Sequence, residues 1–428
     1  MPEIRQTDYL YKVPKFELDR NDVADFAQEL MGFHENFADC FHRSESRENF
    51  YLYMSGQFSQ LERKSIEPIA IAMEGGKIRA MQRFVSDAPW KDEEIGIRYR
   101  SLVNEDLGHP DGAIIFDESG FVKKGDDSIG VGRQYCGTIG KVENCQVGVF
   151  AAYTSVYGYA LIDKRLYIPE HWFSSAYRER REKCKLPPDI EFKTKPQLAV
   201  EMLRNIAEQQ QIPFRYVLAD SVYANSPEFI EAVESLVGVT YLVQVPEDSL
   251  CWFKNPGTIT KTYKYSGQVR TKKILSDQAK DAISIKMLAA GINNFFWYRR
   301  KVSEGAKGPI EYEFTKRRII LSFQGLPHKT AWLLIRRTLG ENPQYSYFLS
   351  NAPTSVKLPT LIWLSGLRWA IEQCFEETKT ELGMDQYEVR KFPGWHHHML
   401  TSMLGHYFLW HLKIRLGKKS TSYYAVAA

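Results

Sequence analysis

Three acidic side chains occupy positions at which metal-dependent chemistry on a phosphate could take place. Asp117 follows the apolar run at 113–116, and Asp220 follows the apolar run in FRYVLAD, so we expect both where a strand leaves the sheet. Side chains at strand ends are held rigidly while the loops leave room for a substrate. Glu372 falls in the helical pattern LRWAIEQCFEETK. Together, three carboxylates would offer the oxygen ligands that Mg²⁺ prefers, although an Asp after a strand is more often a turn-former or a helix cap.

Two cations accompany Glu372 on the same expected helix. At about 100° per residue, Arg368, Glu372 and Lys379 project at roughly 0°, 40° and 20°, which is one narrow stripe. A carboxylate flanked by two cations suits a metal-bound phosphate. The alternative is an ordinary surface ion pair worth about 0.3–0.5 kcal/mol, and the pattern alone does not choose between them. Glu376, one turn further on, competes with Glu372 as the third acidic ligand.

Positive charge is concentrated in one block of the chain. Residues 251–340 contain 18 Lys and Arg against 5 Asp and Glu, a net charge of +13 in a protein whose formal net charge is +4. The cations alternate with aromatic and β-branched residues, which predicts strands with one apolar and one cationic face. Such a face favours nucleic-acid phosphates, although many charge runs are only solvated surfaces. The cations of this block that we expect to contact nucleic acid are Lys272, Lys273, Arg299, Arg300, Lys316, Arg317 and Arg318.

The elements that must position these residues follow from hydrophobic periodicity. Helical spacing dominates up to about residue 107, with further helices expected at 76–85 and 92–107. From residue 112 the order strand, strand, strand, helix, strand, helix, strand predicts a mixed α/β sheet. The basic strand-rich block follows, and helices resume after Pro359, including one long helix over 361–384. We therefore expect an α/β protein of two or three domains.

Composition excludes several other classes. The chain of 428 residues has no apolar run long enough to span a membrane and no secretory signal at its start. Its six cysteines are single, without a CxxC pair, which disfavours a zinc ribbon or a disulfide scaffold. These features predict a cytoplasmic protein without membrane contact.

The blocks FDESGFVKKG, RQYCGTIGKVENCQVGV, VLADSVYA and LRWAIEQCFEETKTELGMDQYEVRKFPGWHHHM resemble, in order, those of bacterial insertion-sequence transposases of the DDE class. The resemblance covers about residues 20–415 and is to the branch with a β-rich insertion before the last acid and a Y-x2-R-x3-E-x6-K signature. It implies that Asp117, Asp220 and Glu372 are the three catalytic, metal-binding acids, and that Arg368 and Lys379 complete the signature. The signature Tyr falls at Ser365, which could offer only a hydroxyl to phosphate, so hairpin formation on the second DNA strand is unsupported.

The resemblance further implies a ribonuclease H-like core with an α-helical N-terminal domain and a β-rich insertion. Its cofactor would be Mg²⁺, two ions per site, with Mn²⁺ as a substitute and no small-molecule cofactor. The partners would be double-stranded DNA, as inverted-repeat ends and target, and a second copy of the chain in a homodimer on paired ends. The expected division is a helical DNA-binding region at 1–108, the first part of the core at 109–248, the basic insertion at 249–350, the last core helices at 351–416 and a tail at 417–428.

Several assignments stay open at this stage. Lys123, Lys124 and Arg133, in a glycine-punctuated loop, are expected to guide the DNA end, whereas the helix of residues 1–105 that reads the repeat is not identified. The run 396–398 is three consecutive histidines, for which we expect a surface or DNA-contact role rather than a metal site, since consecutive helical residues point in different directions. Trp172 and Trp395 are expected in the core rather than stacked on a base, and Cys136 and Cys145 as packing residues. The competing functions are a catalytically silent, transposase-derived regulator and a structure-specific metal-dependent nuclease.

Overall fold

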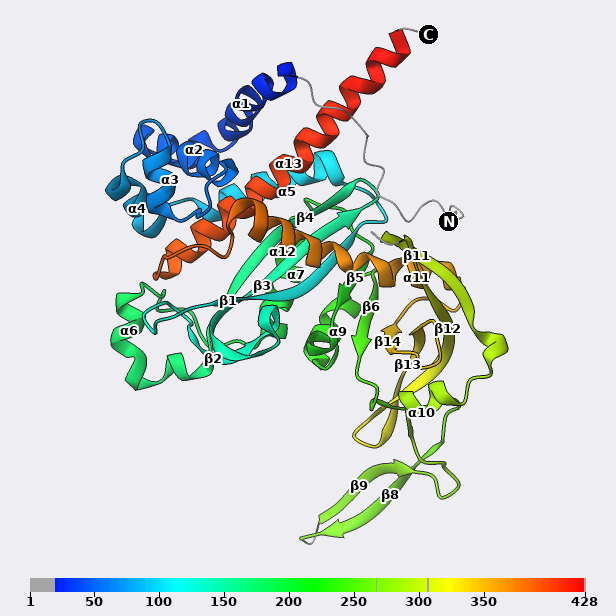
Figure 1. Ribbon diagram of the computed structural model, residues 1–428. Coiled ribbons are helices and arrows are strands. Elements are labelled where there is room, and N and C mark those ends of the chain that lie inside the picture. Colours follow the sequence, from blue (N-terminus) through cyan, green and yellow to red (C-terminus); the bar gives the residue numbers. More distant parts are fainter. Residues whose placement is uncertain (1–19, 267, 306–307, 427–428) are drawn as a thin grey trace. The chain divides into compact units, whose positions relative to one another are not determined.

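The computed structural model describes residues 20–266, 268–305 and 308–426, and Figure 1 shows the chain coloured along its sequence. These residues form two compact units. The first, which we call the terminal unit, contains residues 20–215 and 369–426. The second, the central unit, contains residues 216–368. Each unit contains both strands and helices.

Helices form the first part of the terminal unit, as the sequence predicts. Leu30, Phe33 and Phe37, which the helical spacing places on one apolar face, are all buried. The helix expected at 92–107 is present with those bounds. The helices are α1 (Arg20–Glu35), α2 (Ser44–Phe58), α3 (Ile66–Ala72), α4 (Ile78–Asp87) and α5 (Asp92–Leu107), with a 3-10 turn, η1 (Ala38–Cys40).

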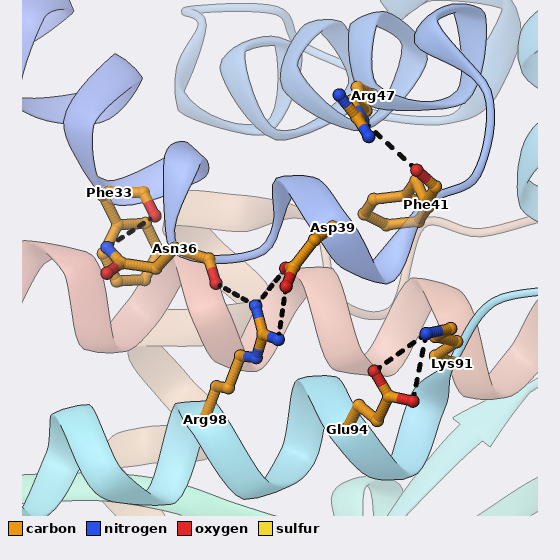
Figure 2. Close-up of polar contacts among 8 residues, drawn as sticks. All are labelled: Phe33, Asn36, Asp39, Phe41, Arg47, Lys91, Glu94 and Arg98. Carbon is orange, nitrogen blue, oxygen red and sulfur yellow. Dashed lines mark hydrogen bonds and ion pairs between the residues drawn. The ribbon is translucent and has the colours of Figure 1, made fainter.

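Polar contacts attach the segment after α1 to α5 (Figure 2). The Arg98 guanidinium donates to the Asn36 carbonyl oxygen at 3.0 Å and to both carboxylate oxygens of Asp39, one of them at 2.7 Å. This hydrogen bonding lowers the pKa of Asp39. Arg47 of α2 donates to the Phe41 carbonyl oxygen at 3.2 Å, so the turn between α1 and α2 is held from both sides.

Strand β3 is the central strand of the sheet in the terminal unit. It pairs antiparallel with β1 along one edge and with β2 and β4 along different parts of its length. A tight turn at residues 156–157 joins β3 to β4. Gly158 is required at this turn, since a Cβ would lie 2.6 Å from the Trp410 ring. The strands are β1 (Ala113–Val122), β2 (Gly132–Cys136), β3 (Lys141–Ser155) and β4 (Gly158–Tyr167).

Helices cover both faces of this sheet. Glu118 of β1 forms an ion pair of 2.7 Å with Lys195 at the start of α7, which places α7 on one face. On the other face, the Phe150 ring of β3 lies 5.2 Å from Phe375 of α12 and 6.3 Å from Trp395 of α13. A sheet buried on both faces explains why its strands read as nearly continuous apolar runs. The helices are α6 (Arg178–Lys183), α7 (Lys195–Gln209), α12 (Trp369–Leu382) and α13 (Phe392–Val426).

The central unit contains a mixed sheet. Strand β5 (Tyr216–Ala219) runs parallel to β6 (Thr240–Val245), and the remaining pairs, β6–β14, β14–β13, β13–β12, β12–β11, β12–β7 and β7–β10, are antiparallel. These further strands are β7 (Leu250–Trp252), β10 (Ile283–Ser284), β11 (Tyr298–Gly305), β12 (Gly308–Phe323), β13 (Leu326–Thr338) and β14 (Tyr345–Ser350). A separate ribbon joins β8 (Thr258–Tyr265) to β9 (Gln268–Leu275). The helices are α8 (Ser221–Ala224), α9 (Pro227–Glu234), α10 (Ile285–Ala290) and α11 (Leu358–Leu367).

The mixed α/β class expected from the sequence is therefore confirmed. The start of α9 is fixed locally, because the Ser226 hydroxyl accepts a hydrogen bond from the Phe229 backbone N–H and Pro227 occupies the first turn. Among the described residues, no helix has the length and apolar character needed to cross a membrane.

Candidate active site

Asp117 lies in the middle of β1, not at its end. It stands opposite Phe150, and the pairing of β1 with β3 continues as far as Val122. The prediction that the chain leaves the sheet at Asp117 is therefore wrong. The acidic pair does not end the strand because β3 goes on pairing with it and because Lys195 neutralises Glu118. Asp117 is partly buried, and its carboxylate accepts a hydrogen bond of 2.8 Å from the Glu118 backbone N–H.

The register places Asp117 on the face of the sheet that α12 covers. Residues directly opposite each other in an antiparallel pair point to the same face, so Asp117 shares its face with Phe150. The Phe150 ring packs against Phe375 of α12, with 5.2 Å between ring centres. Glu372 precedes Phe375 by three residues, which is less than one helical turn. Within the terminal unit, the fold thus brings the helix segment that carries Glu372 over the strand position that carries Asp117.

Lys379 fixes the direction of α12 along β1. Its ammonium group donates to the Thr138 hydroxyl at 3.2 Å and lies 5.4 Å from the centre of the Phe121 ring. Phe121 follows Asp117 by four residues and so points to the same face. Burial lowers the pKa of Lys379. The helix therefore runs along the strand, with its Glu372 end near Asp117 and its Lys379 end near Phe121.

Glu372 is exposed on α12, whereas its neighbours Ile371 and Cys374 are buried against the unit's core. The helical spacing predicts that Ile371 and Phe375 face the core, and both are buried. The competing acid, Glu376, is also exposed, and its carboxylate accepts a hydrogen bond of 2.8 Å from the Gln373 amide. Both acids can therefore be replaced without opening the core, so they form a matched pair for mutation.

The helix expected around Glu372 is interrupted at Arg368. Helix α11 ends at Leu367 and α12 begins at Trp369, and Arg368 belongs to the central unit while Glu372 belongs to the terminal unit. The prediction of one unbroken helix is therefore wrong. Glu372 and Lys379 nevertheless lie seven residues apart on the single helix α12, and Arg368 itself keeps α-helical dihedral angles (φ −58°, ψ −28°), so the interruption does not contradict the predicted stripe. The physical reason is packing: α11 contacts β6, β11 and β12 of its own unit, and α12 contacts β1, β3 and β4 of the other.

Ser365, at the position of the signature Tyr, is buried in α11. Its hydroxyl donates to the Ile362 carbonyl oxygen at 2.7 Å. The expectation that this hydroxyl could contact phosphate is therefore wrong, because the group is buried and already hydrogen-bonded within its own helix.

Asp220 follows β5 directly, as the sequence predicts. Its carboxylate accepts a hydrogen bond of 2.9 Å from the Val222 backbone N–H and caps the short helix α8. It is partly buried and belongs to the central unit.

In the described part of the chain, no three His, Cys, Asp or Glu side chains gather into a group that could hold a metal ion. The donor chemistry of the expected trio nevertheless suits Mg²⁺, since Asp117, Asp220 and Glu372 offer only carboxylate oxygens. Two of them, Asp117 and Glu372, lie on facing elements of the terminal unit. The third, Asp220, lies in the central unit.

The cations described in the β8–β9 ribbon are exposed to solvent. Nearly all of its described residues are exposed, including Lys272 and Lys273. Residues 258–275 include no Asp or Glu. Lys261 stands directly opposite Lys272, so two positive side chains share one face of the ribbon. Like charges in this position destabilise a ribbon, and a bound anion would relieve the repulsion.

Cations on β12 are more closely tied to the fold. Lys316 and Arg318 lie over the Trp332 ring, at 4.2 Å and 5.4 Å from its centre, and Arg317 lies 4.8 Å from the centre of the Phe296 ring. Burial lowers the pKa of both Lys316 and Arg317.

The two cations of β11 are also engaged. The Arg299 side chain donates to the Glu311 carboxylate at 3.0 Å, and the Arg300 guanidinium donates to the Arg299 carbonyl oxygen at 2.7 Å. Both guanidinium groups of β11 therefore make hydrogen bonds within the unit, whereas Lys272 and Lys273 of the ribbon are exposed.

Lys123 serves the fold of the terminal unit. Its ammonium group donates to the Tyr387 carbonyl oxygen at 2.9 Å and lies 3.3 Å from the centre of that ring. Burial lowers the pKa of Lys123 to about 8. It thereby ties the loop after β1 to the segment after α12, whereas Lys124 and Arg133 are exposed.

The consecutive histidines are mainly core residues. His398 is fully buried and lies 2.7 Å from the Tyr53 hydroxyl, and His397 lies 2.7 Å from the Val85 carbonyl oxygen and stacks on Trp90. The expected surface or DNA-contact role is therefore wrong for these two. They face inward because α13 is buried nearly all round at this level. Trp172, Trp395, Cys136 and Cys145 are fully buried, which confirms their expected packing role.

The sequence analysis did not identify a groove in the terminal unit, which we call the α4 groove. It has a volume of 1280 Å³ and lies between α3–α4, the loop at 122–128 and the segment at 385–391. Its cationic lining residues are Arg63, Arg79, Arg83, Lys123, Lys124, Arg390 and Lys391. The available signal was the spacing of Arg79 and Arg83, four residues apart on one face of an expected helix.

The chain is similar in sequence to known proteins. The chain is 23% identical over 357 residues to a probable transposase for insertion sequence element IS701 of Microchaete diplosiphon, which covers 83% of this chain and 79% of the relative. Two solved structures are similar only at low TM-scores. They are a piggyBac transposase synaptic complex with hairpin DNA (TM-score 0.40, 8% identity, 92% of this chain and 76% of the other) and the NurA nuclease from Sulfolobus solfataricus (TM-score 0.27, 11% identity, 65% and 83%). At these scores the two structures carry no argument about the fold.

The sequence also matches the family described as "DDE superfamily endonuclease" over residues 36–309. This range is well over half of the chain and contains both Asp117 and Asp220. The protein therefore belongs to the DDE superfamily of endonucleases.

Proposed function

We propose that this protein is the transposase of an insertion sequence, which binds the inverted-repeat ends of its element and catalyses strand cleavage and strand transfer by a cut-and-paste route. Membership of the DDE superfamily and the IS701 relative support this proposal. The structural observation that carries it is the placement of α12 over the Asp117 position of β1, which brings two acids that are 255 residues apart in sequence to facing elements.

In this proposal, Asp117, Asp220 and Glu372 hold two Mg²⁺ ions, for which Mn²⁺ substitutes. Bound there, the ions would supply an activated water or 3′-hydroxyl and would stabilise the leaving 3′ oxygen of a phosphodiester. Strand β1 holds the Asp117 carboxylate rigidly because β3 pairs with it on both sides of that position. The aromatic contact between Phe150 and Phe375 fixes the height of α12 above the strand.

The remaining signature residues would bind phosphate. Lys379 is held by Thr138 at the far end of the contact between α12 and β1, so its charge would steady the DNA backbone beside the acids. Arg368 would add a bidentate contact, which a guanidinium makes with phosphate. Its position at the junction of two helices means that the relative placement of α11 and α12 would set its contribution.

The proposal also includes the architecture that the resemblance implies. The core would be ribonuclease H-like and interrupted by the basic insertion, and the active form would be a homodimer on paired ends. The cations of the β8–β9 ribbon are the part of the insertion best placed to contact DNA, because they are exposed and lack acidic neighbours along the ribbon.

A matched pair of variants tests the catalytic assignment. Purified protein, Mg²⁺ or Mn²⁺, labelled duplexes from the DNA flanking the gene and a target plasmid are combined, and free 3′-hydroxyl ends and joined products are measured. Glu372→Gln should abolish both products while DNA binding persists, whereas Glu376→Gln, one turn further along the same helix, should retain both. Equal activity of the two variants would refute the role of Glu372.

The same assay separates the alternatives. Cleavage and joining by the wild-type protein indicate a transposase, cleavage alone a nuclease, and binding alone a silent regulator.

A further inference from the structure

Helices α3 and α4 are two short helices that contact each other across a tight turn. Five residues, Met73 to Lys77, join them, and Gly75 has a φ of +81° in this turn. Gly76 is also required, because a Cβ there would lie 2.3 Å from the Ala70 carbonyl oxygen. Helix α2 contacts both helices, so the three form a compact bundle. A tight glycine-containing turn between two short helices is the arrangement that presents the second helix to a DNA groove.

Helix α4 has one buried and one exposed face. Met81, Phe84 and Val85 are buried against the bundle. Gln82 and Arg83 are exposed and line the α4 groove together with Arg79. Arginine forms paired hydrogen bonds with guanine, and glutamine with adenine, in the major groove of DNA. The exposed face of α4 therefore carries side chains that can distinguish base pairs.

Three of the five acids that line the groove are neutralised by cations of the fold, and the other two, Glu67 and Asp385, are exposed. Glu388 pairs with Arg63, Asp127 pairs with Arg390, and Asp87 pairs with both Lys391 and Lys185. These ion pairs also hold the groove walls together, because each joins segments that are far apart in sequence.

Three exposed cations of the groove are not engaged in the ion pairs described above. Within the described residues, Arg79, Arg83 and Lys124 form no ion pair with an acidic side chain. Their charges face a concave surface, where they are available to an anionic ligand. A DNA backbone beside the major groove would supply phosphates to them.

Two residues that line the α4 groove are connected to the acids of the terminal unit by short, regular segments of chain. Lys123, the first loop residue, comes six residues after Asp117, and at about 3.3 Å per residue the strand spans roughly 20 Å. Asp385, in the segment that Lys123 contacts, follows Glu372 by thirteen residues, of which ten lie in α12 and span about 15 Å. At 3.4 Å per base pair, 15–20 Å corresponds to about five base pairs of duplex DNA.

We propose that the α4 groove binds duplex DNA about five base pairs inside the cleaved end of the element. In this site α4 reads base edges with Arg83 and Gln82, while Arg79 and Lys124 hold the phosphates on either side. The segments that follow the strand of Asp117 and the helix of Glu372 line the same groove as α4, which couples recognition of the end to the position of the cut. Only this distance to the cut rests on the proposed function.

The test measures binding separately from catalysis. Labelled 30-base-pair duplexes that tile the DNA flanking the gene, and a scrambled duplex, are titrated with the full-length protein without metal at 0.15 M salt. Arg83→Ala should weaken the specific duplex about tenfold or more and the scrambled duplex much less. Arg83→Lys should keep binding to the scrambled duplex but lose the discrimination. Arg204→Ala, an exposed arginine on α7, removes the same charge and should bind as the wild type.

Footprinting locates the site. Base pairs protected by the wild type and released by Arg83→Ala should centre about five base pairs from the cleaved end. Equal discrimination by the Arg83→Ala and Arg204→Ala variants, with unchanged melting temperatures, would overturn the proposal, and so would released protection confined to distant base pairs. Loss of discrimination without any cleavage by the wild type would support the groove and would refute the transposase assignment instead.

Discussion

Replacing one cross-strand pair of the β8–β9 ribbon should weaken DNA binding in a salt-dependent way. Lys261 and Lys272 stand opposite each other on the same face, and both are exposed. Each lysine that contacts a phosphate releases condensed counterions, so the affinity for DNA falls more steeply with salt as the number of such contacts rises. The double variant Lys261→Ala/Lys272→Ala removes two contacts without removing any buried group.

The size of the effect follows from the number of contacts. Each phosphate contact contributes about 0.9 to the slope of log affinity against log salt concentration, so the double variant should lower that slope by about 1.8. Between 50 and 200 mM salt, this difference amounts to roughly a 12-fold change in the ratio of the two affinities. The melting temperature should stay the same or rise slightly, because a repulsive cross-strand pair is removed.

Fluorescence anisotropy with a labelled duplex, titrated at four salt concentrations, measures the slope. The control is Arg178→Ala/Lys183→Ala on α6, which removes the same charge from a helix where Glu179 alternates with the cations. An unchanged slope in the ribbon variant, or an equal drop in the control, would refute the reasoning that the ribbon contacts DNA.

Two further predictions concern stability. Gly76→Ala should lower the free energy of unfolding by at least about 1 kcal/mol, because the new Cβ would meet the Ala70 carbonyl oxygen. Gly32→Ala should raise the free energy of unfolding by about 0.5–1 kcal/mol, because a Cβ there has nothing within 4 Å and Ala favours a helix over Gly. Urea unfolding measures both changes, and equal effects would contradict the geometry. Burial lowers the pKa of His398 from 6.5 to about 4, so the unfolded chain takes up a proton that the folded protein excludes, and stability present above pH 6.5 should be lost by about 3 kcal/mol as the pH falls to 4. Urea unfolding at pH 7, 6 and 5 checks this loss, and a flat profile would show that the histidine is not kept neutral by the fold.

Much of the local structure could be predicted from the sequence. The helix at 92–107, the turn between β3 and β4 and the start of α9 at Ser226 all follow from short-range rules of spacing and capping. The strand before Asp220 ends where predicted because the Asp side chain caps the next helix. In each case the signal and the structure involve neighbouring residues.

Two predictions near the candidate site were wrong because the outcome depended on contacts between segments that are far apart in sequence. The strand at Asp117 continues because β3, on a distant stretch of sequence, pairs with it. The helix around Arg368 is interrupted because its two halves pack on different sheets. The histidines at 397 and 398 have the composition of a surface cluster, but the packing of α13 makes them core residues.

By itself, the sequence determined the α/β class, the acids that could do the chemistry and the block in which positive charge gathers, because these depend on residue type and on short-range periodicity. Only the tertiary structure decided that α12 passes over β1 at the Asp117 position, that the Lys123 ammonium group donates a hydrogen bond to the Tyr387 carbonyl oxygen and that α4 presents Arg83 to a groove. Those outcomes depend on contacts between segments tens to hundreds of residues apart, and the direction of a side chain in such a contact is set by the packing of whole elements.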